Sequence, residues 1–501
     1  MTKTISGEII GIEAIPIEVE VGILSGLHTF NIVGLADKSI NEAKERISLA
    51  IKSIGAKPPL QFSKKIIVNL APADLKKEGS HYDLAITLAF LKASGQIKGD
   101  IEDKIFIGEL SLKGQIRKAK GAICYVLMAK KYGIKEIFIP KENEDEVSFI
   151  KGIKIFPIST LRELIDHLSG VRELKPLETK EFSPEWPEEK FYSYIKGLDF
   201  LKRVLQIVSS GGHHLLLFGS PGTGKSLLAQ SIVDLLPPLN FDELIEVITI
   251  HSIYGSKISF TRPFRSPHHS ASEVSILGGG QKVKAGEITL AHNGVLFLDE
   301  FPEFSRKVLE GLREPLENGY IVISRAKEKI NFPAKFILIA AMNPCPCGWF
   351  GDPEKDCRCT LSEVRKYQKK VSGPILDRFD IFVNVPRIET EKILNERKEI
   401  EDISKIREKI LKTREIQLER QGKLNRDLTF KELEKFIKIG KEEKEFLINV
   451  GERLKISPRG IHKILKVART IADFEEKEKI EIQHLQEALW YRESQVFENQ
   501  V

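Results

Sequence analysis

The segment that decides the fold reads LLLFGSPGTGKSLLAQSIV and runs from Leu215 to Val233. Four apolar residues predict a buried strand, and a helix-like run follows the motif GxxxxGKS. The glycines of the motif let the backbone curl so that its N–H groups face phosphates at the positive end of the helix. The segment therefore predicts an ATP site, in which Lys225 contacts the β- and γ-phosphates and Ser226 is a ligand of Mg²⁺. The expected nucleotide-binding residues are Gly219, Ser220, Pro221, Gly222, Thr223, Gly224, Lys225 and Ser226.

Two later segments place polar side chains at the ends of apolar strands. The sequence GVLFLDEF predicts a strand over Val295–Leu298, followed by Asp299 and Glu300. After a motif of the first kind, we expect Asp299 to hold Mg²⁺ and Glu300 to polarise the attacking water. The next strand, in FILIAAMNP, leads to Asn343, whose amide we expect to orient that water against the γ-phosphate.

Arginines further along the chain are candidates for the remaining charges of a phosphate site. Arg378, in GPILDRFDIFVNV, is a candidate arginine finger for the ATP of a neighbouring subunit; the alternative is a structural pair with Asp377 or Asp380. Arg459 follows a predicted helix start in ISPRGIHKIL, where it is expected to fold over the phosphates. Arg313, in GLREPLENG, is a further candidate for action on a neighbour.

Length and composition limit the class of protein. A chain of 501 residues exceeds one ordinary core, so two to four domains are expected. A hydrophobic fraction of 42% with 30% charged residues is typical of soluble globular proteins. No apolar run approaches the roughly 18 residues of a membrane span, and the N-terminus does not resemble a signal peptide, so we expect a cytoplasmic protein without a membrane partner. The formal charge of +6 permits nucleic-acid binding without requiring it.

Periodicity and composition divide the chain into four parts. We expect an N-terminal α/β domain (1–170), a charged, proline-containing linker (171–190), a parallel α/β core (191–388) and a helical C-terminal domain (389–501). In the first domain, strands are expected over Lys65–Leu70 and Lys104–Ile107, and helices over Ser39–Ile54 and Tyr82–Ser94. In the core, strands are expected over Leu215–Phe218, Val295–Leu298 and Phe336–Ala340.

Four of the five cysteines lie together in the stretch NPCPCGWFGDPEKDCRCTLSE (343–363), which contains a predicted insert at 344–360. Cys345, Cys347, Cys357 and Cys359 form two C-x-C pairs separated by nine residues rich in Gly, Pro and Asp. Four thiolates suit tetrahedral Zn²⁺, which we expect here as a structural ion. An iron–sulfur cluster and free thiols remain alternatives. The fifth cysteine, Cys124, lies in an apolar helical run and is expected in the core.

Longer motifs identify the chain as a member of the YifB/ComM family of Mg chelatase-like AAA+ ATPases. The telling segments are FRSPHHSASEVSILGGG, which resembles the helix-2 insert of this clade, and LREPLENGYIVISRA, which resembles its pre-sensor-1 hairpin. N-terminal segments such as FNIVGLADKSINEAKERI and GELSLKGQIRKAKG extend the resemblance over the full length. It implies a Lon-protease-like (ribosomal S5 domain 2-like) N-terminal domain, sensor 1 at Asn343 and sensor 2 at Arg459.

The Lon-like resemblance raises the question of proteolysis. Lon-type sites use a Ser–Lys dyad, but the corresponding turn here reads EGSHYD, with His81 at the serine position and Ile123 near the lysine position. Ser80 and Lys120 are close in sequence and out of register for the dyad. We therefore expect a binding or assembly domain without protease activity.

The family resemblance implies a motor that acts on DNA. Members of the family that act in natural transformation are understood as hexameric helicases for branch migration, so an ATP-dependent homo-hexamer on single-stranded or branched DNA is expected. Basic residues expected to contact DNA are Arg325, Lys327 and Lys329 in one hairpin, and Lys282 and Lys284 in the insert. The rival interpretation is a chelatase-type ATPase that remodels a protein partner; the N-terminal domain and the cysteine insert favour DNA. His268 and His269 are expected to shape the insert rather than bind metal.

Overall fold

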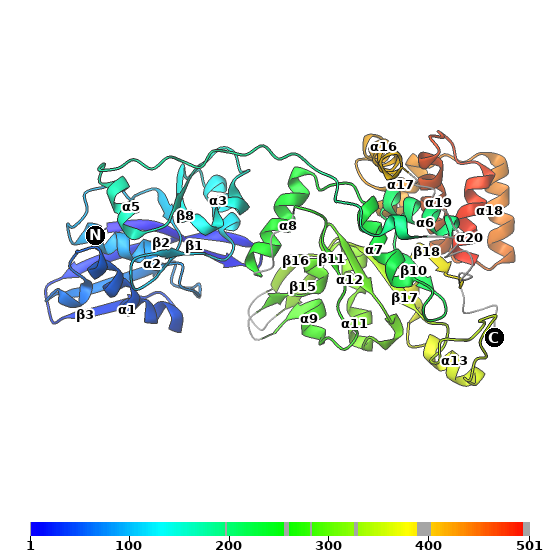
Figure 1. The fold of residues 1–501 in the computed structure, drawn as a ribbon, viewed down its shortest axis with the longest axis horizontal. Coiled ribbons are helices and arrows are strands. Elements are labelled where there is room, and N and C mark those ends of the chain that lie inside the picture. The colour runs from blue at the N-terminus through cyan, green and yellow to red at the C-terminus, as the bar shows by residue number, and fades with distance from the viewer. Residues whose placement is uncertain are drawn as a thin grey trace. The chain divides into compact units, whose positions relative to one another are not determined.

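The computed structural model describes residues 2–195, 198–254, 260–280, 283–324, 329–387 and 402–493. The chain forms two compact units (Figure 1): Met1–Ser183 with Ile248–Ile258, and Pro184–Val247 with Ser259–Val501. The segment 171–190 contains neither helix nor strand. Across the described ranges, none of the helices has the length and apolar character that crossing a membrane requires.

The first unit is built on a mixed seven-stranded sheet. Its strands are β1 (Thr2–Ile10), β2 (Glu13–Leu24), β3 (Thr29–Val33), β4 (Lys65–Ala71), β5 (Lys104–Phe106), β8 (Glu136–Pro140) and β9 (Lys154–Ile158), in the order β3-β4-β2-β1-β5-β8-β9. Pairing is antiparallel from β1 to β2 and from β2 to β4, and parallel elsewhere. Ile17, Val19 and Val21 alternate inward along β2, as expected for a strand with one face on the core.

Helices α1 (Lys38–Ser53) and α2 (Asp83–Ala93) pack with this sheet, and α3 (Ala122–Lys131), α4 (Glu144–Val147) and α5 (Leu161–Leu168) complete the unit. Helix α2 is buried from Asp83 to Leu91, which explains why its sequence is apolar on all sides. The two strands and two helices predicted in this region are confirmed to within one residue at each end.

The second unit contains a parallel five-stranded sheet. Its strands are β10 (Leu215–Phe218), β11 (Phe264–Arg265), β14 (Val295–Leu298), β17 (Ile337–Met342) and β18 (Ile381–Asn384), in the order β11-β14-β17-β10-β18. Strands β10, β14 and β17 are buried throughout, as expected for parallel strands covered on both faces. Their alignment pairs Phe218 with Met342 and Leu298 with Ala340. The carboxyl ends of three strands therefore meet at one edge.

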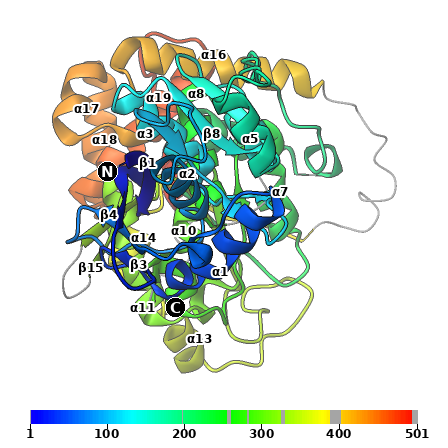
Figure 2. The same cartoon turned by 90° about the vertical axis from the view of Figure 1, so that its left-hand side faces the viewer.

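Helices surround this sheet, and the C-terminal ones share its core. They include α6 (Asp199–Gly211), α7 (Lys225–Leu235), the first part of α8 (Phe241–Ile253), α9 (Glu273–Leu277), α10 (Glu287–Leu290), α11 (Arg306–Gly311), α12 (Arg313–Asn318), α13 (Leu361–Gln368), α14 (Gly373–Leu376), α16 (Ile403–Gln421), α17 (Phe430–Phe436), α18 (Lys441–Arg453), α19 (Pro458–Phe474) and α20 (Ile482–Glu493). Helices α16, α17 and α19 lie together in both views (Figure 1 and Figure 2). The fold class is confirmed at the level of architecture: an α/β domain at the N-terminus, a parallel α/β core and a helical C-terminal region.

Two short hairpins interrupt the second unit. Strand β15 (Tyr320–Ser324) pairs with β16 (Lys329–Pro333), so the expected hairpin is present. Strand β12 (Gly278–Gly279) pairs with β13 (Lys284–Ala285) in the insert.

Candidate functional site

The phosphate loop follows strand β10 directly. Gly219, Gly222 and Gly224 have φ of 157°, 78° and 88°, values that favour glycine over residues with a side chain. Helix α7 begins at Lys225, so its first N–H groups lie at the end of this loop. Local structure is therefore that of an anion site at a helix N-terminus, as the sequence predicts.

The ammonium of Lys225 holds the loop together. Its Nζ donates to the carbonyl oxygens of Gly219 (2.7 Å) and Ser220 (2.9 Å) and to Oδ1 of Asn343 (3.2 Å). Burial lowers the pKa of this ammonium to about 8, although the nearby Asp299 carboxylate opposes the shift. The structure thus brings two predicted site residues from different strands, Lys225 and Asn343, into direct contact.

The expected magnesium ligands also lie together. The hydroxyl of Ser226 donates to Oδ2 of Asp299 at 2.8 Å, and the other carboxylate oxygen accepts from the backbone N–H of Glu300 at 2.9 Å. A hydroxyl and a carboxylate are oxygen ligands of the kind that Mg²⁺ prefers. The donor set therefore fits the ion, and it lies beside the phosphate loop as an ATP-bound Mg²⁺ requires.

One cavity of about 680 Å³ lies between the phosphate loop and the polar residues that follow β14 and β17. It is lined by Pro221–Leu227 of the loop, by Asp299, Glu300 and Asn343, and by Ser266–His269 of the insert. The insert residues were not predicted to reach the site. His269 places Nδ1 at 2.9 Å from Oε2 of Glu300. The adjacent histidines His268 and His269 were the only hint in the sequence that this segment takes part in a site. Nothing in the sequence indicated that His269 would contact Glu300.

Arg378 lies outside this cavity. Its Nη2 donates to Glu317 at 2.8 Å, rather than to Asp377 or Asp380 as the structural alternative supposed. Asp380 is bound instead by Lys463 at 2.5 Å and by the backbone N–H of His214 at 2.9 Å. The Arg378 side chain is mostly buried, and its Nε has no hydrogen-bond partner among the described residues.

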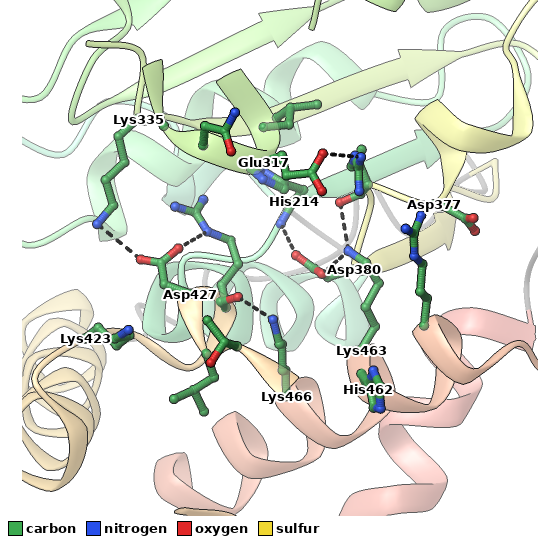
Figure 3. Close-up of a pocket in the computed structure, with 18 of the residues that line it drawn as sticks. His214, Glu317, Lys335, Asp377, Asp380, Lys423, Asp427, His462, Lys463 and Lys466 are labelled. Atoms are coloured by element: carbon green, nitrogen blue, oxygen red, sulfur yellow. Dashed lines mark hydrogen bonds and ion pairs between the residues drawn. The ribbon is translucent and has the colours of Figure 1, made fainter. Parts of the chain in front are cut away.

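A second cavity of about 730 Å³ holds both candidate arginines, Arg378 and Arg459. Seven Lys or Arg and four Asp or Glu side chains line it: Lys335, Arg378, Lys423, Arg426, Arg459, Lys463 and Lys466, with Glu317, Asp377, Asp380 and Asp427. Figure 3 shows Lys463 beside Asp380, and Lys335 beside Asp427 at 3.1 Å. Burial opposes ionisation of the Asp380 carboxyl, but Lys463 holds its pKa well below the usual range. Arg459 therefore sits with Arg378 and not over the phosphate loop of its own chain, where the sequence placed it.

The four thiols of the cysteine insert converge on one point. The Sγ atoms of Cys345, Cys347, Cys357 and Cys359 all lie within 4.8 Å of one another, and the separation from Cys345 to Cys357 is 3.6 Å. Four ligands at a Zn–S bond of about 2.3 Å stand about 3.8 Å apart, so the set fits a tetrahedral ion. Burial opposes thiolate formation at Cys347, but N–H groups of Trp349 and Arg358 lower its pKa to about 6. Cys124 is buried, as expected.

The cysteine insert contacts the phosphate loop. A Cβ on Gly348, where φ is 86°, would lie 2.5 Å from Cγ of Pro221, so the Gly348 backbone packs against the Pro221 ring at a distance that glycine allows. A hydrogen bond from the Ser220 side chain lowers the pKa of the Asp352 carboxyl. The insert also begins directly after Asn343, and Cys345 lies two residues after it. Its position thus affects the shape of the nucleotide cavity.

The N-terminal domain shows no Ser–Lys dyad among its described residues. The Ser80 hydroxyl donates to Glu109, and Lys120 is exposed to solvent. His81 is partly buried, with Nε2 at 2.8 Å from the carbonyl of Gly7, and desolvation lowers its pKa to about 4.

The residues expected to contact DNA are described only in part. Lys282, Arg325 and Lys327 lie outside the described residues. Lys284 and Lys329 are exposed on β13 and β16. Arg313 is half exposed and pairs with Glu310 at 3.2 Å, and it lines neither cavity.

Three family models match successive parts of the chain. Residues 192–393 match the model described as magnesium chelatase, subunit ChlI; residues 19–143 match subunit ChlI of Mg-chelatase; and residues 401–492 match the C-terminal part of subunit ChlI. The sheet order, the phosphate loop and the acids at the end of β14 thus belong to an AAA+ module of the Mg-chelatase class.

Full-length relatives narrow this class. Competence protein ComM of Haemophilus influenzae and the uncharacterized protein YifB of Escherichia coli are each 42% identical to the chain, over 96% of its length and 95% of theirs. An uncharacterized MCM-type protein of Methanocaldococcus jannaschii is 26% identical over 52% of the chain and 31% of its own length. The chain belongs to the YifB/ComM family of Mg chelatase-like AAA+ proteins.

Proposed function

We propose that the chain is an ATPase whose active site is shared between two copies, and that it works as a DNA motor. The proposal of a shared site rests on the separation of the phosphate-binding residues from the two candidate arginines. Lys225, Ser226 and Asp299 line one cavity, whereas Arg378 and Arg459 line another. The buried Nε of Arg378 has no hydrogen-bond partner among the described residues, so this donor is left unsatisfied within the single chain.

Each residue then has a defined task. The loop 219–226 binds the phosphates through its N–H groups, and Lys225 exchanges its carbonyl contacts for phosphate oxygens. Ser226 and Asp299 would hold Mg²⁺, which neutralises charge on the phosphates when bound. Glu300 and Asn343 orient the attacking water. Arg378 and Arg459 of the neighbouring copy stabilise charge on the transferred phosphoryl group.

A head-to-tail contact that supplies arginines to the next copy is heterologous, and it closes into a ring if the rotation fits. We propose a homo-hexamer that assembles with ATP. The donor chemistry at the cysteine insert supports structural Zn²⁺ in each chain.

The DNA part of the proposal draws on the relatives. One is named a competence protein, and another is of MCM type. Exposed Lys284 and Lys329 lie on two hairpins of the core, which suits contact with a phosphate backbone. The test is the ATPase rate of the purified chain with forked or four-way DNA, against blunt duplex and no DNA. Stimulation by branched DNA that falls steeply with salt is expected; equal rates with and without any DNA would contradict the proposal.

A chelatase-type ATPase that remodels a protein partner is the second candidate, because all three matching family models are described as magnesium chelatase. The N-terminal residues 19–143 themselves match such a model, so this domain does not separate the two functions as the sequence argument supposed. ATPase stimulation by a co-purifying protein, with none by DNA, would favour this candidate.

A further inference from the structure

The insert residue His269 is the side-chain partner that the structure gives to the Glu300 carboxylate. The distance from Nδ1 to Oε2 is 2.9 Å. An ionised carboxylate only accepts hydrogen bonds, so a proton on Nδ1 of the imidazole would make this close contact favourable. The pair lies in the same cavity as the phosphate loop and Asn343. His269 therefore contacts the one acid to which water activation is assigned.

The sheet brings these two residues together from positions 31 apart in sequence. Strand β11 runs parallel to β14, with Phe264 opposite Val295 and Arg265 opposite Leu296. Arg265 is fixed by two hydrogen bonds to Glu287, at 2.6 and 2.8 Å. The loop that follows β11 consequently leaves the sheet beside the acids that follow β14.

A turn then sets the direction of the imidazole. The N–H of Ala271 donates to the carbonyl of His268 at 2.9 Å, and the His268 ring contacts the Ser270 hydroxyl through Nδ1 at 2.7 Å. The rings of His268 and His269 lie 4.2 Å apart, and Phe304 stands edge-on at 6.5 Å from His269. His268 is thus occupied locally, whereas His269 faces Glu300.

Glu300 needs such support. Its φ is 52°, a left-handed conformation that costs a non-glycine residue free energy and persists where the surroundings fix it. Its side chain is half exposed, so packing alone does not select one rotamer. A misplaced carboxylate costs turnover, because the attacking water must be held within hydrogen-bond reach of it.

We propose that His269 is a positioning residue for Glu300, through which the insert controls the turnover of ATP. The inference rests on the proposed ATPase activity. His269 acts on the carboxylate and not on the phosphate loop, so it governs the hydrolytic step and leaves nucleotide affinity unchanged.

The test compares three substitutions in the full-length chain. His269→Ala is expected to lower kcat by about tenfold to a hundredfold, with the ATP dissociation constant unchanged within about twofold. His269→Asn places an amide N–H near the position of Nδ1 and should recover much of the lost turnover. His269→Gln has the same amide one methylene further out, where Nε2 lies, and should not. Thermal melting and equilibrium binding of a fluorescent ATP analogue report folding and affinity for each variant.

The outcomes separate this inference from the proposed function. A wild-type chain that binds ATP without hydrolysing it would refute the ATPase proposal itself. Wild-type hydrolysis with a fully active His269→Ala variant would overturn the role of His269 alone. Equal losses in the Asn and Gln variants, or a loss of ATP affinity that matches the loss of rate, would also overturn it.

Discussion

Replacing Arg378 by alanine separates a structural role from a role in the neighbour's ATP site, because the two roles differ greatly in size. Among the described residues Arg378 makes one ion pair, with Glu317 at 2.8 Å, and the Glu317 side chain is 57% exposed. The guanidinium is mostly buried, but the carboxylate is open to solvent, and a pair screened in this way contributes about 1 kcal/mol to stability. An arginine finger contributes about 10³-fold or more to turnover, which is about 4 kcal/mol of transition-state stabilisation.

The expected result is a folded protein with almost no ATPase activity. Arg378→Ala should lower the melting temperature by only a few degrees, retain ATP binding and lose about 10³-fold in kcat. Glu317→Ala is the matched control, because it breaks the same ion pair and leaves the guanidinium in place. This control should keep its ATPase activity. Equal losses in both variants would show that the ion pair, and not the guanidinium, is what turnover requires.

Mixing two inactive proteins tests whether the site is shared. Lys225→Ala retains Arg378, and Arg378→Ala retains the phosphate loop. With random assembly of equal amounts, about one interface in four joins an intact loop to an intact arginine. ATPase activity should then return to about a quarter of the wild-type value. If mixed rings form, as pull-down of a tagged variant would show, and no activity returns, Arg378 does not act between chains.

Three further predictions concern the nucleotide and the metal. Lys225→Ala should abolish ATP binding, whereas Glu300→Gln should bind ATP with near-normal affinity and barely hydrolyse it. Equilibrium binding and single-turnover rates measure both effects. Normal hydrolysis by the Glu300 variant would exclude a role of Glu300 in activating water. Purified protein should contain about one zinc per chain. The double substitution Cys345→Ser and Cys357→Ser should release this zinc and lower the melting temperature. Elemental analysis of protein never exposed to chelator measures the zinc content, and a metal-free wild type would refute the prediction. Because the pKa of Lys225 is about 8 in the chain and phosphates favour its charged form, ATP affinity should be full below pH 8 and fall as pH rises above it; binding titrations at pH 7 and 9 would show no difference if this proton were not coupled to binding.

The sequence was most informative where local pattern and chemistry coincide. Strands Leu215–Phe218 and Val295–Leu298 were predicted to the residue, because each is a short apolar run that ends at a polar motif. The convergence of Lys225 with Asn343 followed from parallel strands whose carboxyl ends meet at one edge.

Contacts that depend on the placement of loops and helices were not predictable in the same way. The partner of Arg378 is Glu317, 61 residues earlier, and nearby Asp377 and Asp380 were the natural guesses from sequence. Arg459 was expected over the phosphates, but the packing of α19 carries it into the cavity of Arg378. His269 meets Glu300 only because β11 lies beside β14, and a two-residue strand gives a weak signal in sequence.

The buried carboxylate of Asp380 has a mechanical consequence. It binds Lys463 of α19 on one side and the backbone N–H of His214 on the other, and His214 directly precedes β10. Strand β10 is four residues long, about 13 Å, and Gly219 of the phosphate loop follows its far end. A load applied to the C-terminal helices is therefore passed through one stiff strand to the base of the phosphate loop. A force on the C-terminal helices would act at the start of strand β10, and nucleotide bound to the phosphate loop would act at its end.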